Sequence, residues 1–113
     1  MPFVTVEDGT RINYALAGRR DGEPLLLIHG LGADTRGWVM QRRALASRFR
    51  LVMADNRGAG RSDHPEGPYD LSVMATDALA ALDHAGYGSA HVMGASMGGI
   101  IAQIIGVLHP ERV

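Results

Sequence analysis

The chain has 113 residues, of which 46% are hydrophobic and 20% charged, and its formal net charge at pH 7 is −1. This length corresponds to one domain, which can bury roughly two-thirds of the surface that its unfolded chain exposes. The sequence contains no cysteine and no lysine, which excludes disulfides, thiolate nucleophiles, Schiff-base chemistry and lysine-dependent phosphate loops. Its 11 basic residues are scattered arginines balanced by 12 acids, unlike the concentrated basic surface of a nucleic-acid-binding protein.

The start of the chain has neither the basic nor the apolar region of a signal peptide, because residues 1–10 alternate and carry acids early. No apolar run approaches the roughly 18 residues that a membrane span needs. We therefore expect a cytoplasmic protein without a membrane or nucleic-acid partner, and nothing in the sequence calls for a cofactor.

The first half of the chain predicts three strands and a helix. Two alternating runs, Phe3 to Val6 and Arg11 to Leu16, flank an Asp8-Gly9 turn and predict an antiparallel hairpin. The continuous apolar run from Leu25 to Ile28 is typical of a strand that is covered on both faces. From Trp38 to Phe49 the apolar positions fit one helical stripe, which predicts an amphipathic helix.

The second half alternates strands and helices. A short apolar run, Leu51 to Ala54, predicts a strand, and the spacing from Leu71 to Ala85 predicts an amphipathic helix. Either Asp70 or Ser72 can cap the start of that helix, and the next residue after it, a glycine at position 86, can end it.

The last two elements are a strand from Ala90 to Met93 and a helix from Ile100 to Leu108, which ends before Pro110. That helix is apolar almost all round, as in a helix packed inside a larger body. The element order β-β-β-α-β-α-β-α implies parallel strands after the hairpin, with flanking helices. Seven glycines follow three of the strands, where ligands bind in open α/β sheets: Gly30, Gly32, Gly58, Gly60, Gly94, Gly98 and Gly99.

One sequence motif indicates a catalytic residue. Residues 94–98 match G-x-S-x-G at the junction of a predicted strand and a predicted helix. In a nucleophile elbow the serine, here Ser96, adopts a strained backbone conformation in a sharp turn. A Cβ two residues before or after it would collide with neighbouring backbone, which explains Gly94 and Gly98. The turn presents the hydroxyl at a helix N-terminus, where developing negative charge is favoured.

A second segment fits the same chemistry. The loop that follows Ile28 contains His29, Gly30 and Leu31, and it can direct a backbone N–H toward the oxygen of a carbonyl group whose carbon Ser96 attacks. Together with the N–H of Met97, this amide would form an oxyanion hole with two donors.

These motifs resemble, in order and spacing, the N-terminal part of α/β-hydrolase-fold proteins, over nearly the whole chain. They are His29-Gly30, residues 55–62 (DNRGAGRS) and residues 94–99 (GASMGG). Within that fold the chain is similar to the esterase, enol-lactonase and cofactor-free haloperoxidase branch. The resemblance implies that Ser96 is the nucleophile and that the N–H groups of Leu31 and Met97 form the oxyanion hole. Dehalogenases and epoxide hydrolases of this fold have Asp in place of that serine, which argues against those two activities.

The sequence departs from the family where the other catalytic residues are expected. The triad runs Ser, acid, His in chain order, and only Glu111 and His109 follow Ser96. Both lie beyond the last helix, about 20 Å from the elbow. We therefore expect that residues 1–113 are the N-terminal segment of one hydrolase domain and are a poor catalyst alone. We expect an open sheet edge beside the Ser96 strand, paired with a complementary C-terminal chain or in a homo-oligomer.

Two functions from different classes remain open. The first is a serine hydrolase of carboxylic esters or lactones, or a cofactor-free perhydrolase on the same serine. The alternative is a catalytically inactive module that binds a small ligand or pairs along its open edge.

Several other residues can be interpreted either as structural or as functional. Trp38 either lines the pocket above Ser96 or belongs to the core. His29 is either a substitute base or, as we expect, structural. Asp55 and Arg57 are expected to brace their loop by hydrogen bonds. Residues 58–60 lack the third glycine of a dinucleotide-binding loop, and no histidine pair has metal-ligand spacing. Three methionines are expected to face the core: Met74, Met93 and Met97.

Overall fold

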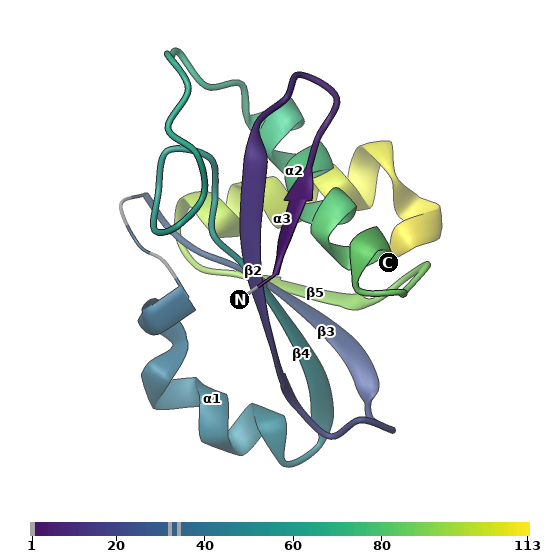
Figure 1. Cartoon of the computed structure of the whole chain (residues 1–113). Coiled ribbons are helices and arrows are strands. Elements are labelled where there is room, and N and C mark those ends of the chain that lie inside the picture. The colour runs from purple at the N-terminus through teal and green to yellow at the C-terminus, as the bar shows by residue number, and fades with distance from the viewer. Residues whose placement is uncertain (1, 32, 34) are drawn as a thin grey trace.

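The computed structural model describes residues 2–31, 33 and 35–113, and its elements follow the predicted order (Figure 1). The strands are β1 (Phe3–Thr5), β2 (Arg11–Gly18), β3 (Glu23–Ile28), β4 (Phe49–Ala54) and β5 (His91–Gly94). The helices are α1 (Val39–Ala46), α2 (Leu71–His84) and α3 (Met97–Leu108), with short 3-10 turns at Thr35–Trp38 and Pro110–Arg112.

The five strands form one mixed sheet in the order β1-β2-β4-β3-β5. β2 pairs antiparallel with β1 and with β4, whereas β3 pairs parallel with β4 and β5. Ile28 at the end of β3 lies opposite Ala54 of β4 on one side and Gly94 of β5 on the other. The carboxyl ends of three neighbouring strands therefore meet at one edge of the sheet, where α/β folds place their ligands.

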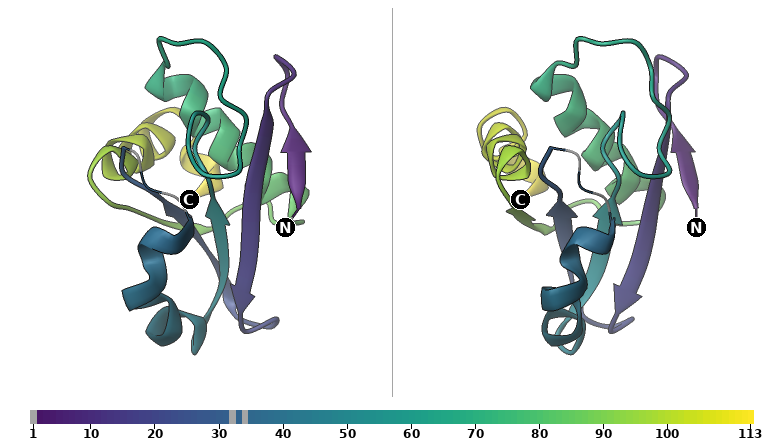
Figure 2. Two further views of the ribbon diagram at one scale, coloured as in Figure 1. Left: turned by 60° about the vertical axis from the view of Figure 1, so that its left-hand side comes forward. Right: turned by 90° about the vertical axis from the view of Figure 1, so that its left-hand side faces the viewer.

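Both faces of the central strands are covered, which explains their continuous apolar runs. Leu26 and Ile28 pack with α2 and α3, while Leu25 and Leu27 pack with Trp38 and the end of α1 on the opposite face. All four leucine and isoleucine side chains are at most 4% exposed. In both views of Figure 2, α1 lies apart from the pair α2 and α3.

The predicted turn and caps are confirmed. Gly9 has φ +88° in the β1–β2 hairpin, and the Val6 amide donates to the Thr10 carbonyl over 2.9 Å. At the start of α2, Asp70 rather than Ser72 is the N-cap, because its carboxylate accepts a hydrogen bond from the Ser72 amide. Gly86, with φ +98°, follows the C-cap.

The helix expected from Trp38 to Phe49 is shorter than predicted. The α-helix spans Val39–Ala46, and Phe49 is the first residue of β4, where it pairs with Glu23 of β3. Phe49 still packs against the same apolar cluster as Trp38, so the stripe was correct although the helix boundary was wrong. Pairing with two neighbouring strands outweighs the weak helical preference of this segment.

The last helix differs in two ways. It begins at Met97 rather than Ile100, directly after the serine turn. Its apolar surface is only partly covered, since Ile101 and Ile105 are buried whereas Val107 is 77% exposed. Met93 was also expected in the core and is 40% exposed. The serine turn sets the start of the helix. Met93 lies on β5, which is the last strand in the order, and no described strand pairs with its outer edge.

Among the described residues, no helix combines the length and the apolar character that a membrane crossing requires.

Candidate active site

Ser96 lies at the sharp turn between β5 and α3. It is the N-cap of α3, with φ 55° and ψ −120°, and no other described non-glycine residue has a positive φ. A side chain in such a conformation costs about 1–3 kcal/mol, which the surrounding structure must offset. The residue is exposed, so the turn presents a hydroxyl to solvent at the N-terminus of a 12-residue helix.

The two flanking glycines make this turn possible. A Cβ at Gly94 would lie 2.0 Å from the carbonyl oxygen of Gly98. A Cβ at Gly98 would lie 2.1 Å from the carbonyl oxygen of Ile28, at the end of β3. These contacts agree with the steric explanation of the motif, and the second shows that α3 starts in direct backbone contact with the neighbouring strand.

The loop after β3 lies against the serine turn. The Ala95 amide donates to the Ile28 carbonyl over 3.1 Å. A Cβ at Gly30 would lie 3.3 Å from the Cβ of Ser96 and 3.9 Å from its Oγ. Gly30 is therefore the point where the β3 loop passes closest to the serine side chain.

The amides of Leu31 and Met97 flank this point. Neither donates a hydrogen bond to another residue within 2–31, 33 and 35–113. Leu31 is 86% exposed. Both residues line the same pocket, and their role as an oxyanion hole stays a prediction.

That pocket has a volume of about 190 Å³ and lies between the loops after β3 and β4, the start of α2 and the start of α3. Most of its lining is apolar or backbone: Gly30, Leu31, Asn56, Arg57, Gly58, Ala59, Tyr69, Leu71, Met74 and Met97. Arg57 is the single charged residue of this lining. Ser96 itself is not among these lining residues, but the next residue, Met97, and the nearby Gly30 are. The pocket therefore has room for a small uncharged group close to the serine turn.

Trp38 is a core residue, and it is not among the residues that line the pocket of Leu31 and Met97. It is 6% exposed and packs in the cluster with Leu27 and Met53. It also lines a second cavity of about 60 Å³, together with His29 and Ala95. His29 is 2% exposed and its ring lies 5.7 Å from the Trp38 ring, as expected for a structural residue.

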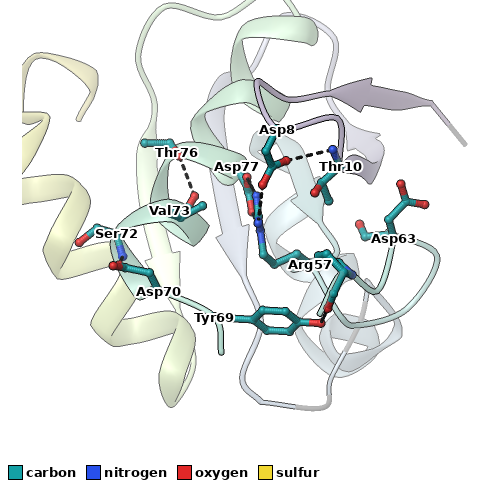
Figure 3. A network of polar contacts seen from close by, with 12 residues as sticks. Asp8, Thr10, Arg57, Asp63, Tyr69, Asp70, Ser72, Val73, Thr76 and Asp77 are labelled. Carbon is teal, nitrogen blue, oxygen red and sulfur yellow. Dashed lines mark hydrogen bonds and ion pairs between the residues drawn. The ribbon is translucent and has the colours of Figure 1, made fainter. Parts of the chain in front are cut away.

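Arg57 is held by two carboxylates, which Figure 3 shows converging on its guanidinium. Nε and Nη2 donate to the two carboxylate oxygens of Asp77 over 2.6 and 2.9 Å, and Nη1 donates to Asp8 over 2.9 Å. Arg57 and Asp77 are buried, so this bidentate pair ties the β4 loop to α2, and Asp8 ties it to the β1–β2 turn.

The network shifts the pKa values of its members. The hydrogen bonds that Arg57 donates to Asp77, and secondarily to Asp8, raise the pKa of Arg57. Hydrogen bonds from Thr10 and then from Arg57 lower the pKa of Asp8 to about 2. Arg57 thus stays charged and is paired with two carboxylates, whose charges oppose the binding of an anionic substrate at this side of the pocket. The expected bracing role of Arg57 is confirmed.

Asp55 braces the same loop from the other side, as predicted. Its carboxylate accepts hydrogen bonds from Asn13 Nδ2 over 2.8 Å and from the Arg61 amide over 3.0 Å. Its carbonyl accepts the Ser62 hydroxyl over 2.7 Å.

Three residues of this region escaped the sequence interpretation: Asn56, Tyr69 and Asp77. The Asn56 side chain donates to the His29 carbonyl over 3.2 Å, and the Tyr69 ring covers Gly58, where a Cβ would lie 2.4 Å from Cε2. Only Asp77 had a signal in the sequence, because it is a charged residue on the apolar stripe of α2 between Met74 and Ala78.

The structure brings no base to Ser96. Within the described residues its hydroxyl makes no hydrogen bond to a histidine or carboxylate, His84 bonds to the Tyr14 hydroxyl, and His91 pairs with Glu23. His109 lies beyond the far end of α3, as predicted. In the same part of the chain no group of three or more His, Asp or Glu residues can hold a metal ion.

The sequence matches the family described as alpha/beta hydrolase fold over residues 23–113. It is 41% identical, over its whole length, to a putative carbamate hydrolase RutD from Azorhizobium caulinodans, of which it covers 42%. It is 36% identical to mouse Epoxide hydrolase 4 over 98% of the chain and 32% of that protein. The crystal structure of an enol-lactonase from Burkholderia xenovorans superposes with a TM-score of 0.93 at 32% identity, covering 99% of this chain and 44% of the enol-lactonase.

The chain thus spans well under half the length of these relatives. The matched family region covers β3 to the end of the chain, including the serine turn and both neighbouring loops. On the fold, the sheet order and this match, the chain belongs to the α/β hydrolase fold family.

Proposed function

We propose that this chain is the nucleophile-bearing part of a serine hydrolase that acts on carboxylic esters or lactones. Ser96 Oγ attacks the carbonyl carbon, and the N–H groups of Leu31 and Met97 stabilise the negative oxygen that forms. Cleavage of the acyl carbon–oxygen bond leaves the acyl group on Ser96, and the alcohol oxygen takes up the proton that the serine hydroxyl lost. The alcohol of an ester departs, whereas the ring of a lactone opens and its hydroxyl stays attached to the acyl group. Water then adds to the acyl carbon, and the acid product leaves as Ser96 regains its proton.

One observation supports this proposal above all: a strained, exposed serine at the start of α3. A residue kept only for a tight turn would be glycine, which adopts φ 55° without strain. Strain of about 1–3 kcal/mol persists where it serves a function. The exposed hydroxyl, the amides without hydrogen-bond partners in the described chain and the adjoining pocket give that function a physical basis.

The acid and the histidine base are proposed to lie outside these 113 residues. They would come from further sequence of the same domain or from a complementary chain, with residues 1–113 as the N-terminal segment. The open edge of β5 and the exposed apolar side chains of α3 support this view, because a further strand and its connections would cover them.

The substrate class follows from the pocket and the nucleophile. The lining offers no free charge, since Arg57 is engaged by Asp77 and Asp8, so an uncharged acyl compound fits best. A serine nucleophile favours esters and lactones over epoxides, which enzymes of this fold open with an aspartate. The similarity to an enol-lactonase supports a lactone, and the carbamate-hydrolase relative makes a carbamate the next compound to assay.

The alternative is a catalytically inactive member of the family that binds a small ligand or pairs along its open edge. The absence of a base next to Ser96 in the described chain favours it for residues 1–113 taken alone.

A fluorophosphonate probe separates the two functions, because it reacts covalently with an activated serine. We expect the full-length protein to gain one adduct by intact mass, located on Ser96 by peptide mapping. Ser96→Ala should lose the adduct, while Ser89→Ala, a matched change of an exposed serine away from the elbow, should keep it. Absence of the adduct from the folded wild-type protein would contradict the proposal and favour the inactive module.

A further inference from the structure

Asn56, in the loop after β4, holds the loop after β3 through a side-chain hydrogen bond. This residue is 6% exposed, and its Nδ2 donates to the carbonyl oxygen of His29 over 3.2 Å. The two loops leave neighbouring strands at the same level, because Ile28 and Ala54 are the last paired residues of β3 and β4. The side-chain amide of Asn56 therefore replaces the next backbone hydrogen bond between β3 and β4, at the point where the two backbones diverge.

The His29 peptide is fixed on its other side by the serine turn. A Cβ at Gly98 would lie 2.6 Å from the His29 carbonyl oxygen, so the first turn of α3 packs directly on this peptide. One residue earlier, the Ile28 carbonyl accepts the Ala95 amide. The start of the β3 loop is thus held between Asn56 and the backbone that carries Ser96.

We propose that Asn56 is a positioning residue for the oxyanion hole, which it orients through the His29 peptide. The Leu31 amide lies two residues beyond the bonded carbonyl, and the residue between them is Gly30, whose missing side chain leaves the backbone few restraints. Fixing the His29 carbonyl therefore fixes the starting direction of the chain that presents the Leu31 N–H. This inference rests on the proposed serine hydrolase.

Asn56 acts through the loop and not on the substrate. Its side-chain N–H group is engaged by the His29 carbonyl, although the residue lines the same pocket as Leu31 and Met97. Removing it leaves a buried carbonyl without that donor, and the peptide can turn toward another one. A turn of this peptide would swing the Leu31 N–H away from the position of the oxyanion.

The expected effect lies below that of deleting an oxyanion donor. Removing one donor costs about 10²- to 10³-fold in kcat, and a displacement of about 1 Å costs up to about 10²-fold. We expect Asn56 variants to lower kcat by roughly 10- to 100-fold while KM changes less than about twofold, because ground-state binding does not use the oxyanion.

The test compares two Asn56 variants with a matched control in the full-length enzyme. Asn56→Leu removes the amide, and Asn56→Asp keeps its size but replaces the donor with an oxygen that repels the His29 carbonyl. Ser62→Ala removes two other buried hydrogen bonds, the one that the hydroxyl donates to the Asp55 carbonyl of the same loop and the one that it accepts from the Asn13 amide, both away from the β3 loop. Rates with a neutral p-nitrophenyl ester are divided by the concentration of sites titrated with fluorophosphonate, and melting temperatures are recorded.

A second measurement uses a boronic acid, which forms a tetrahedral adduct with the serine and so mimics the transition state. We expect its Kd to rise in both Asn56 variants by the same factor as kcat/KM falls, and to stay unchanged in Ser62→Ala even where the melting temperature drops. Asn56 variants with normal kcat per titrated site and normal boronate affinity would overturn the inference. A wild-type enzyme that fluorophosphonate does not label would instead overturn the proposed function itself.

Discussion

The loops that follow β4 and β5 lie close together, but their polar residues differ in burial and in hydrogen bonding. After β4, Asp55, Asn56 and Arg57 are buried and bonded to partners on four other segments. After β5, Ser96 is exposed, strained and without a side-chain hydrogen bond to the described residues. The first loop is a rigid support, and the second presents a reactive group.

This difference indicates how the structure maintains backbone strain at Ser96. A conformation that costs about 1–3 kcal/mol persists only when its surroundings determine it fully. The β4 loop supplies part of that rigidity through the Asn56 bond to the β3 loop, on which α3 begins. Four predictions test the contrast, from the largest expected effect to the smallest.

Asp77→Ala should remove most of the support of the β4 loop. The change leaves Arg57, which is 8% exposed, as a buried cation with only Asp8 to pair with. Breaking a buried ion pair from one side costs about 3–5 kcal/mol, so urea unfolding should show a loss of that size. The matched control is Asp21→Ala, which breaks the exposed Arg19–Asp21 pair and should cost less than about 1 kcal/mol. Equal losses in the two variants would show that the β4 network is no stronger than a surface pair.

Gly98→Ala should disturb the serine turn by overpacking. The new Cβ would lie 2.1 Å from the Ile28 carbonyl oxygen, so backbone must move, at a cost of about 1–3 kcal/mol in unfolding free energy. Gly106→Ala, in the same helix and with no atom within 4 Å of its new Cβ, should instead stabilise by about 0.5–1 kcal/mol. A Gly98→Ala protein as stable as the wild type would contradict the close approach of α3 to β3.

Ser96→Gly should be more stable than Ser96→Ala by about 1 kcal/mol. Both variants lose the hydroxyl, but only glycine adopts φ 55° and ψ −120° without strain, and the gain is reduced by the greater freedom of glycine in the unfolded chain. Thermal unfolding of the two variants measures the strain directly. If alanine were the more stable of the two, the turn would not be strained.

The smallest expected effect is on the stability of the protein at acidic pH. The pKa of Asp8 falls from its ordinary value of 3.8 to about 2 through hydrogen bonds from Thr10 and Arg57. Because the folded-state pKa is the lower one, its stabilisation is present above pH 4 and is lost as the pH falls from about 4 to about 2. Asp8→Asn should flatten the dependence of stability on pH in this range, measured by unfolding at several pH values. Glu7→Gln, a neighbouring exposed change, should leave the slope as in the wild type.

Local patterns predicted much of the fold. The order of strands and helices, the Asp8-Gly9 turn and a cap of α2 at either Asp70 or Ser72 follow from neighbouring residues, and all are confirmed, with Asp70 as the cap. The boundaries at Phe49 and Met97 were wrong because strand pairing and the serine turn decide them. The exposed positions of Met93 and Val107 were not predicted, because burial depends on which elements cover a surface and not on the apolar character of a residue.

The candidate site divides in the same way. The G-x-S-x-G spacing located the elbow because the pattern itself is short, extending only two residues to each side of Ser96. The clash at Gly94 is local, with Gly98, whereas the clash at Gly98 is with the Ile28 carbonyl at the end of β3, which only the fold brings there. The two carboxylate partners of Arg57 and the Asn56 bond join residues that are 20 to 49 positions apart in the chain. The pocket joins residues still further apart, from Gly30 to Met97.

By itself the sequence determined the fold class, the family resemblance and the position of the strained serine, because each depends on short-range periodicity or sterics. Tertiary structure decided which polar residues are buried supports and which amides remain free of partners in the described chain. It also decided where the pocket lies, beside Gly30 between two loops. Those properties arise only when the parallel pairing of β3 with β4 and β5 brings three strand ends to one edge of the sheet.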